Sequence, residues 1–256
     1  MKQTRILMGM PITIEVVENF DDTAGKASQT IDGVFDYFTY VDNKFSTYKD
    51  SSEISLINQK QITFYQASAD MKLVFALADQ TKHDTDGYFD ISRNGSYDPS
   101  GIVKGWAIYN AAALLRHDGF RNFYVEAGGD IQAEGNNAQG QAWQVGIRNP
   151  FNPDQIVKVL SISNTGVATS GSYIRGQHIY NPKQPDSILS EIVSLTVIGP
   201  NIYEADRFAT AAFAMGREGI VFIETLTGFE GYMIDNAGLA TLTSGFERFV
   251  THDQVH

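Results

Sequence analysis

The sequence predicts an α+β fold in which mixed or antiparallel sheets pack against helices, and three observations lead to this prediction. Helical and strand patterns are mixed along the 256 residues without the strict βαβ repeat typical of a parallel sheet. Helical periodicity dominates up to Gly119, and short β-patterned runs dominate after it. Hydrophobic residues make up 43% of the chain and no long linker occurs, so we expect one domain over residues 1–256, or two tightly joined subdomains with a site between them.

The first half is expected to contain one strand and four helical segments. Residues 5–17 alternate between apolar and polar side chains, as a strand does. Apolar residues recur at helical spacing in the next segments, and Asp118-Gly119 has the composition of a helix C-cap. We therefore expect helices or helical turns over residues 22–44, 51–58, 66–83 and 102–117. Residues 84–101 are rich in Gly, Asp and Ser and are expected to form a loop.

The second half is expected to be mostly β-structure with two helices. Short runs of alternating or β-branched residues separated by turn residues indicate the strands. We expect strands over residues 123–126, 131–134, 143–148, 158–163, 165–169 and 190–199, and closing strands or hairpins over 231–235, 239–243 and 246–250. The helices are expected over residues 205–215 and 219–227.

Composition excludes several classes of function. The formal net charge is −11, which argues against a general nucleic-acid binder and against docking on anionic lipid. The absence of cysteine excludes disulfides, thiolate catalysis and cysteine-bound metals. No apolar run is long enough to span a membrane, and the first residues lack the pattern of a signal peptide. We therefore expect a cytoplasmic protein as the sequence is written, or an extracytoplasmic one if a leader has been trimmed.

Lys104 is the first candidate site residue, because a cation is unfavourable in the first turn of the helix expected after Gly101. One explanation is a lysine that points into water. The other is a phosphate held at the helix N-terminus between Gly101 and Gly105, although the P-loop motif is absent.

Three further segments carry candidate chemistry. Asp206 and Thr210 are four residues apart and share a helical face, where their oxygens suit Mg²⁺; the alternative is a first-turn acid and a solvated threonine. His178 follows a glycine-rich segment, as a base presented by a loop would, although a lone histidine is more often a packing or surface residue. The glycines of E-A-G-G-D, ending at Asp130, permit a close approach of the backbone or simply make a turn.

The order of these segments resembles that of the FAD:protein FMN transferase family, the ApbE-like flavin transferases. The resemblance extends from about Met8 to about Met215 and rests on M-G-M, S-T-Y-K-D-S-S-E-I-S-L-I-N, D-P-S-G-I-V-K-G-W-A, A-G-G-D-I, V-A-T-S-G-S-Y, H-I-Y-N-P and A-D-R-F-A-T-A-A-F. It implies an ApbE-like architecture related to the T-fold. It also implies Mg²⁺-dependent cleavage of FAD, release of AMP and attachment of FMN through a phosphoester to a Thr or Ser hydroxyl of an acceptor protein.

The resemblance also implies roles for individual residues. The metal ligands would be the carbonyl of Gly101 and the side chains of Asp206 and Thr210, with Asp206 also counted as catalytic, and His178 would be the base. The residues that contact FAD would be Met8, Tyr48, Asp98, Lys104 and Ile179. On this interpretation Lys104 faces phosphate oxygens.

The sequence departs from the family pattern at several positions. Residues 92–97 form a six-residue bridge where many members carry a longer insertion that contributes to the nucleotide pocket. Ala209 stands where some members have a second aspartate, so the metal site would have one carboxylate fewer. Two other functions therefore stay open: an FAD pyrophosphatase, in which water replaces the acceptor hydroxyl, and a non-catalytic FAD-binding protein, which would need neither metal nor base.

Overall fold

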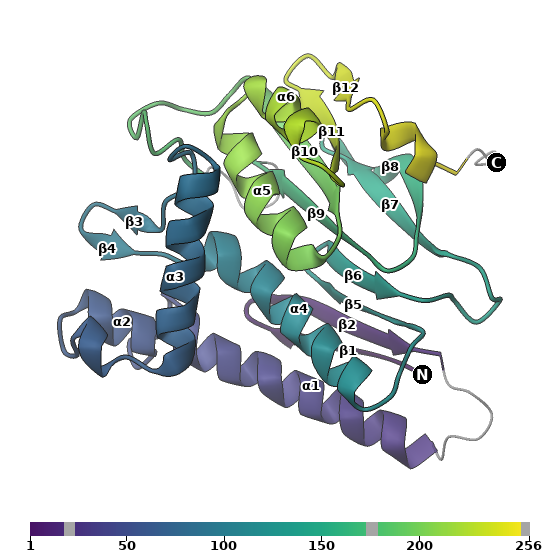
Figure 1. The fold of residues 1–256 in the computed structure, drawn as a ribbon, viewed down its shortest axis with the longest axis horizontal. Helices are drawn as coiled ribbons and strands as arrows, with labels where there is room; N and C mark the ends of the chain where they lie inside the picture. The colour runs from purple at the N-terminus through teal and green to yellow at the C-terminus, as the bar shows by residue number, and fades with distance from the viewer. Residues whose placement is uncertain (18–23, 173–178, 252–256) are drawn as a thin grey trace.

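An antiparallel sheet of eight strands forms the centre of the protein, whose structure is a computed structural model that describes residues 1–17, 24–172 and 179–251. The strand order is β1-β2-β5-β6-β9-β10-β11-β12 (Figure 1). The strands are β1 (Lys2–Leu7), β2 (Met10–Val16), β5 (Phe123–Ala127), β6 (Asp130–Glu134), β9 (Thr165–Gly171), β10 (Ile192–Gly199), β11 (Glu230–Asp235) and β12 (Ala240–Leu242). The expectation of an α+β fold with antiparallel pairing is confirmed.

Helices cover one face of this sheet, and Figure 1 shows them in front of it. They are α1 (Ala24–Phe45), α4 (Ser100–His117), α5 (Ile202–Ala214) and α6 (Glu218–Thr225). A smaller group of elements lies beside the helical layer: α2 (Glu53–Asn58), a 3-10 helix (Phe64–Gln66), α3 (Ala69–Asp84) and the hairpin of β3 (Ser92–Arg93) and β4 (Ser96–Tyr97). The segment from α3 to the start of α4 contributes to the cavity described below.

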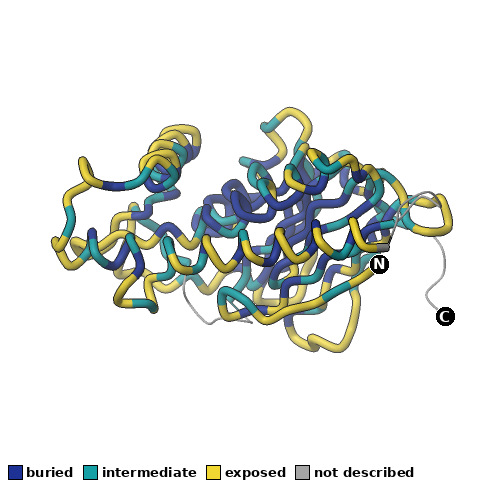
Figure 2. Tube along the Cα trace, turned by 90° about the horizontal axis from the view of Figure 1, so that it is seen from below, coloured by how far each residue is buried: buried dark blue, intermediate teal, exposed yellow. Residues whose placement is uncertain are grey.

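The other face of the sheet is covered by a second, two-stranded sheet of β7 (Trp143–Asn149) and β8 (Asn152–Ile162). Side chains alternate between the faces, so Met233 of β11 joins the large core under the helices, while Tyr232 and Ile234 join a smaller core with Trp143 and Leu160. Figure 2 shows the buried residues between the layers and the exposed residues along the outer surfaces. Because both faces are covered, the central sheet carries buried side chains on both sides.

Glycines allow α5 to approach its neighbours closely. A Cβ atom at Gly105 of α4 would lie 2.6 Å from Cβ of Asp206, and one at Gly166 of β9 would lie 2.1 Å from the backbone nitrogen of Ile202. Gln132 of β6 accepts a hydrogen bond from the Ile202 N–H at 2.8 Å. The N-terminal part of α5 is therefore fixed between α4 and the sheet, which places Asp206 beside α4.

Four expectations about local structure were wrong. Residues 5–17 form two strands of a hairpin, with Met8 and Gly9 at positive φ in the turn. The expected loop over 84–101 contains the β3–β4 hairpin. Residues 246–250 were expected to form a closing strand or hairpin, but Phe246–Phe249 is a 3-10 helix, in which the Arg248 N–H donates to the Gly245 carbonyl and the Phe246 ring is buried in the smaller core. Helix α4 begins at Ser100, so Lys104 is its fifth residue and lies beyond the first turn.

None of the helices within residues 1–17, 24–172 and 179–251 has the length and apolar character that a membrane crossing requires.

Candidate functional site

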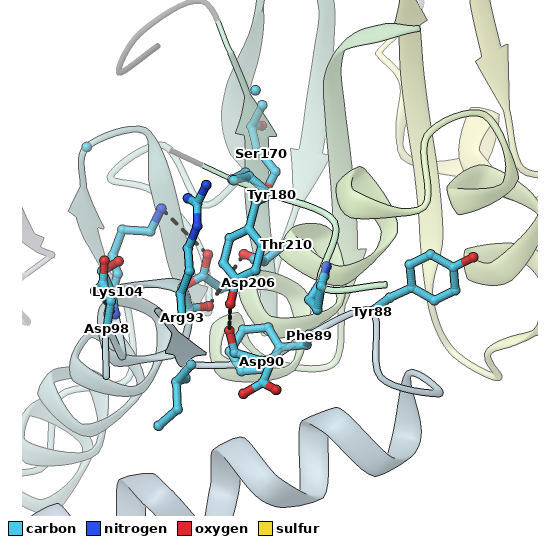
Figure 3. A pocket seen from close by; sticks show the side chains of 18 residues that line it. Tyr88, Phe89, Asp90, Arg93, Asp98, Lys104, Ser170, Tyr180, Asp206 and Thr210 are labelled. Carbon is cyan, nitrogen blue, oxygen red and sulfur yellow. Dashed lines mark hydrogen bonds and ion pairs between the residues drawn. The ribbon is translucent and has the colours of Figure 1, made fainter. Parts of the chain in front are cut away.

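A cavity of about 140 Å³ opens where the N-terminal part of α4, the end of β9 and helix α5 meet. Its walls come from segments far apart in the sequence, among them the connection from α3 to α4 and the residues that follow position 178 (Figure 3). The lining residues are Tyr88, Phe89, Asp90, Ile91, Arg93, Asp98, Ser100, Gly101, Lys104, Gly128, Thr169, Ser170, Gly171, Ile179, Tyr180, Pro182, Asp206 and Thr210.

Lys104 lies between two buried carboxylates at the cavity. Its Nζ atom is 2.5 Å from Oδ2 of Asp130. It is also 3.5 Å from Oδ1 of Asp206, the contact that Figure 3 shows. The side chain of Asp130 is 1% exposed, and its Oδ1 accepts a hydrogen bond from the Thr169 N–H at 2.9 Å. With both carboxylates ionised, two acids and one cation would give this cluster an excess negative charge, which would favour the binding of a further cation.

Asp206 is held in place by the backbone of α4. The Gly105 N–H donates a hydrogen bond to Oδ2 of Asp206 at 2.7 Å, across the close contact that the absent Cβ permits. Burial raises the pKa of Asp206 well above its ordinary value; Lys104 opposes that rise, and the nearby Asp130 adds to it. A metal ion beside this carboxylate would favour its ionised form.

Gly101 and Thr210 bring two more oxygen atoms to the same wall. The hydroxyl of Thr210 donates to the carbonyl oxygen of Gly101 at 3.4 Å. Two oxygens that bind one Mg²⁺ ion at about 2.1 Å in octahedral geometry lie about 3 Å apart, so this pair is close to the required separation. A Cβ at position 101 would meet the Thr210 methyl and the Phe89 ring at 3.2 Å, which explains the glycine.

These donors fit Mg²⁺ in chemical type, with Asp206 as the carboxylate. No group of three or more His, Asp or Glu side chains that could hold a metal occurs among the described residues. A site with one carboxylate, one hydroxyl and one carbonyl is therefore incomplete on its own. Mg²⁺ commonly binds through one or two carboxylates and completes its coordination with water and substrate phosphates.

Six of the nine predicted site residues line this cavity, two described ones do not, and one lies outside the described residues. Those that line it are Asp98, Gly101, Lys104, Ile179, Asp206 and Thr210. Met8 lies in the β1–β2 turn and packs partly against the large core, and Tyr48 is 98% exposed in the connection between α1 and α2. His178 lies outside the described residues, next to the cavity residue Ile179. The functional roles of all nine stay predictions.

Sequence reasoning missed Asp130, Arg93 and Tyr180 as site residues. The segment A-G-G-D was interpreted as a close backbone approach or a turn and as a motif of the family resemblance, but its aspartate, which forms the closest ion pair to Lys104, was given no role. A buried acid needs a cationic partner, but the burial of Asp130 becomes apparent only in the folded structure. Arg93 and Tyr180 line the cavity from segments that were interpreted as loops. Tyr180 belongs to the motif H-I-Y-N-P but was given no role, and nothing in the local sequence of Arg93 distinguishes it.

Comparisons with a family model and with curated proteins indicate the same family. Residues 8–96 and 93–233 match the family model described as ApbE family. The chain is 30% identical over 169 residues to the FAD:protein FMN transferase of Salmonella typhimurium (61% of this chain, 48% of that protein) and 31% identical over 150 residues to that of Escherichia coli K12 (55% and 43%). The chain therefore spans about half the length of the curated relatives it matches.

Solved structures show the same fold over almost the whole chain. The flavin transferase ApbE from Vibrio cholerae has a TM-score of 0.84 at 22% identity and covers 97% of this chain and 98% of its own. The apbe protein from Thermotoga maritima has a TM-score of 0.86 at 19% identity, with 98% and 99% covered.

Proposed function

Because this chain belongs to the ApbE family, we propose that it transfers FMN from FAD to a Thr or Ser hydroxyl of an acceptor protein and releases AMP. The curated relatives are named FAD:protein FMN transferases, which supports the reaction class. The observation that carries the proposal is the convergence of oxygen atoms from Gly101, Asp206 and Thr210 beside the ammonium group of Lys104 in one cavity.

The charge of the cavity favours a metal-bound diphosphate. Its lining includes three carboxylates, Asp90, Asp98 and Asp206, and two cations, Arg93 and Lys104, with Asp130 buried behind them. A diphosphate carries negative charge, so it would be repelled from such a cavity without a divalent cation. Mg²⁺ held by Gly101, Asp206 and Thr210 would neutralise phosphate charge and orient the diphosphate.

The chain's own groups would position the phosphates and limit their movement. Lys104 is proposed to donate hydrogen bonds to a phosphate oxygen, as a point charge on a flexible stem can. Asp130 holds the ammonium group of Lys104 at the cavity and compensates its charge while no phosphate is bound. Phosphoryl transfer depends mainly on such positioning and charge stabilisation, and little covalent help from the protein is needed.

The proposed transfer exchanges one phosphorus–oxygen bond for another. The acceptor hydroxyl oxygen attacks the phosphorus of the FMN half, the bond from that phosphorus to the bridging oxygen breaks, and AMP leaves with the bridging oxygen. The hydroxyl proton needs an acceptor, because the pKa of an alcohol is far above neutral. His178 remains the proposed base, since imidazole titrates near neutral pH and the adjacent Ile179 lines the cavity.

One assay tests this function against its two alternatives. The protein is incubated with FAD, Mg²⁺ and an acceptor domain that carries a candidate threonine, and AMP and covalent flavin fluorescence in a denaturing gel are measured. We expect AMP together with a fluorescent acceptor band. AMP with free FMN would instead identify a pyrophosphatase, and bound FAD without either product would identify a carrier.

A further inference from the structure

Arg93 enters the cavity from the β3–β4 hairpin and lies against the ring of Tyr180 (Figure 3). The central carbon of its guanidinium group is 4.4 Å from the centroid of that ring. The Tyr180 hydroxyl shares its one proton between the carbonyl oxygens of Asp90 at 2.9 Å and Ser92 at 3.1 Å, in the segment that carries Arg93. The ring and the guanidinium group are therefore fixed relative to one another.

The hairpin that carries Arg93 is itself anchored to helices α2 and α3. The Asn58 side chain donates to the Tyr97 carbonyl at 2.9 Å and accepts from the Tyr97 N–H at 2.8 Å. The Asp98 N–H donates to the Ile91 carbonyl at 2.7 Å and closes the base of the hairpin. The Tyr97 ring also contacts Phe75 of α3, with ring centroids 4.9 Å apart. These contacts hold Arg93 at one wall of the cavity before any ligand arrives.

The charge of Arg93 is not compensated by a carboxylate. Within residues 1–17, 24–172 and 179–251, no acidic side chain lies within 4.0 Å of its guanidinium nitrogens, whereas Lys104 has both Asp130 and Asp206. The nearby acids have other partners: Asp90 pairs with Lys82 at 2.6 Å, and Asp98 accepts a hydrogen bond from the Ser100 N–H at 3.0 Å. Stacking occupies one face of the guanidinium group and leaves its N–H edge available for an anion.

From this arrangement we infer that Arg93 is a specificity residue that binds the diphosphate of FAD through its N–H edge, with Tyr180 as the positioning residue that fixes its plane. The inference rests on the proposed function. A guanidinium group can donate two parallel hydrogen bonds to phosphate oxygens, which an ammonium group cannot. Arg93 and Lys104 then hold the diphosphate from two different walls, and Arg93 distinguishes phosphate-bearing ligands from a bare flavin.

The test measures dissociation constants of FAD and of ADP in the presence of Mg²⁺, at low and high sodium chloride, for the wild type and for Arg93→Gln. We expect Arg93→Gln to weaken both ligands by roughly 10- to 100-fold, as the loss of a charge-assisted hydrogen bond does, and to reduce the salt dependence of binding. Arg93→Lys keeps the charge and should retain more affinity than Arg93→Gln. Tyr180→Leu should weaken both ligands by a smaller factor, because the arginine remains but loses its support.

Arg148→Gln provides the matched control, since Arg148 is an exposed arginine of β7 that does not line the cavity. Unchanged FAD and ADP affinity in Arg93→Gln, with wild-type thermal stability, would overturn the inference. Equal losses of affinity in Arg93→Gln and Arg93→Lys, without a change in salt dependence, would also overturn the inference. They would indicate that the guanidinium group stacks on a ring of the ligand and does not bind its phosphates. A wild type that binds neither FAD nor ADP with Mg²⁺ would refute the proposed function and, with it, this inference.

Discussion

Replacing Gly105 with alanine should separate the two helices that form the candidate metal site. The added Cβ would lie 2.6 Å from Cβ of Asp206 and 2.9 Å from both the Asp206 carboxylate and the Ile202 carbonyl oxygen. An ordinary contact at that position needs about 3.4 Å, so α4 and α5 would have to move apart by about 0.8 Å. The hydrogen bond from the Gly105 N–H to Asp206, now 2.7 Å, would then exceed the usual range.

The energetic consequences have opposite signs. Overpacking a well-packed contact costs about 1–3 kcal/mol, and replacing glycine by alanine in a helix recovers up to about 1 kcal/mol. We therefore expect the free energy of unfolding to fall by about 0–3 kcal/mol. The loss of a hydrogen bond to a charged group, about 1.5–3 kcal/mol, should weaken Mg²⁺-dependent FAD binding by roughly 10- to 100-fold.

Urea denaturation and FAD titration with Mg²⁺ measure the two effects separately. Gly33→Ala is the matched control, because Gly33 lies within α1 and an added Cβ would meet nothing within 4 Å. That variant should gain up to about 1 kcal/mol in stability and bind FAD as the wild type does. If Gly105→Ala gained as much stability as Gly33→Ala and bound FAD normally, the reasoning about the α4–α5 contact would be refuted.

Three further changes test other parts of the account. Asp206→Ala should abolish AMP release and acceptor labelling, and unchanged AMP release would remove Asp206 as a metal ligand. His178→Ala should slow acceptor labelling by about 10²–10⁴-fold with little effect on FAD binding, and a normal rate would remove it as the base. Burial tends to raise the pKa of Glu53, but hydrogen bonds from Ser68 and Lys44 outweigh it and hold this pKa below its ordinary value. The ionised Glu53 carboxylate therefore stabilises the fold above its unfolded pKa of about 4.3, and this contribution is lost as the pH falls through the folded pKa. Glu53→Gln should lower the free energy of unfolding at pH 7, and in acid its free energy of unfolding should approach that of the wild type. Urea denaturation at several pH values measures this difference.

Most of the regular elements could be predicted because their signals are local. The apolar spacing of α1 and of α5, and the glycine that follows α4, depend on residues within a few positions of one another. The β1–β2 turn could not be predicted in the same way, because Met8 is an unusual residue at positive φ and its turn is imposed by strand pairing. The burial of Phe246 depends on a contact with the second sheet, which the local pattern does not encode.

The candidate site depends even more on contacts between residues that are distant in the sequence. Resemblance to a family indicated Gly101, Asp206 and Thr210, and the helix pattern placed the last two on one face. The ion pair between Lys104 and Asp130 depends on a β-turn that returns the chain to α4, so no spacing rule could find it. The contact between Arg93 and Tyr180 joins residues 87 positions apart in the chain, and only the folded arrangement brings them together.

The measurement that tests the central claim most directly is a crystal structure with FAD and Mn²⁺, which replaces Mg²⁺ and can be located by its anomalous scattering. The account predicts a metal peak bonded to the Gly101 carbonyl, the Thr210 hydroxyl and the Asp206 carboxylate, with the diphosphate next to it and within hydrogen-bond distance of Lys104. A metal peak elsewhere, or a diphosphate bound away from Lys104, would contradict it.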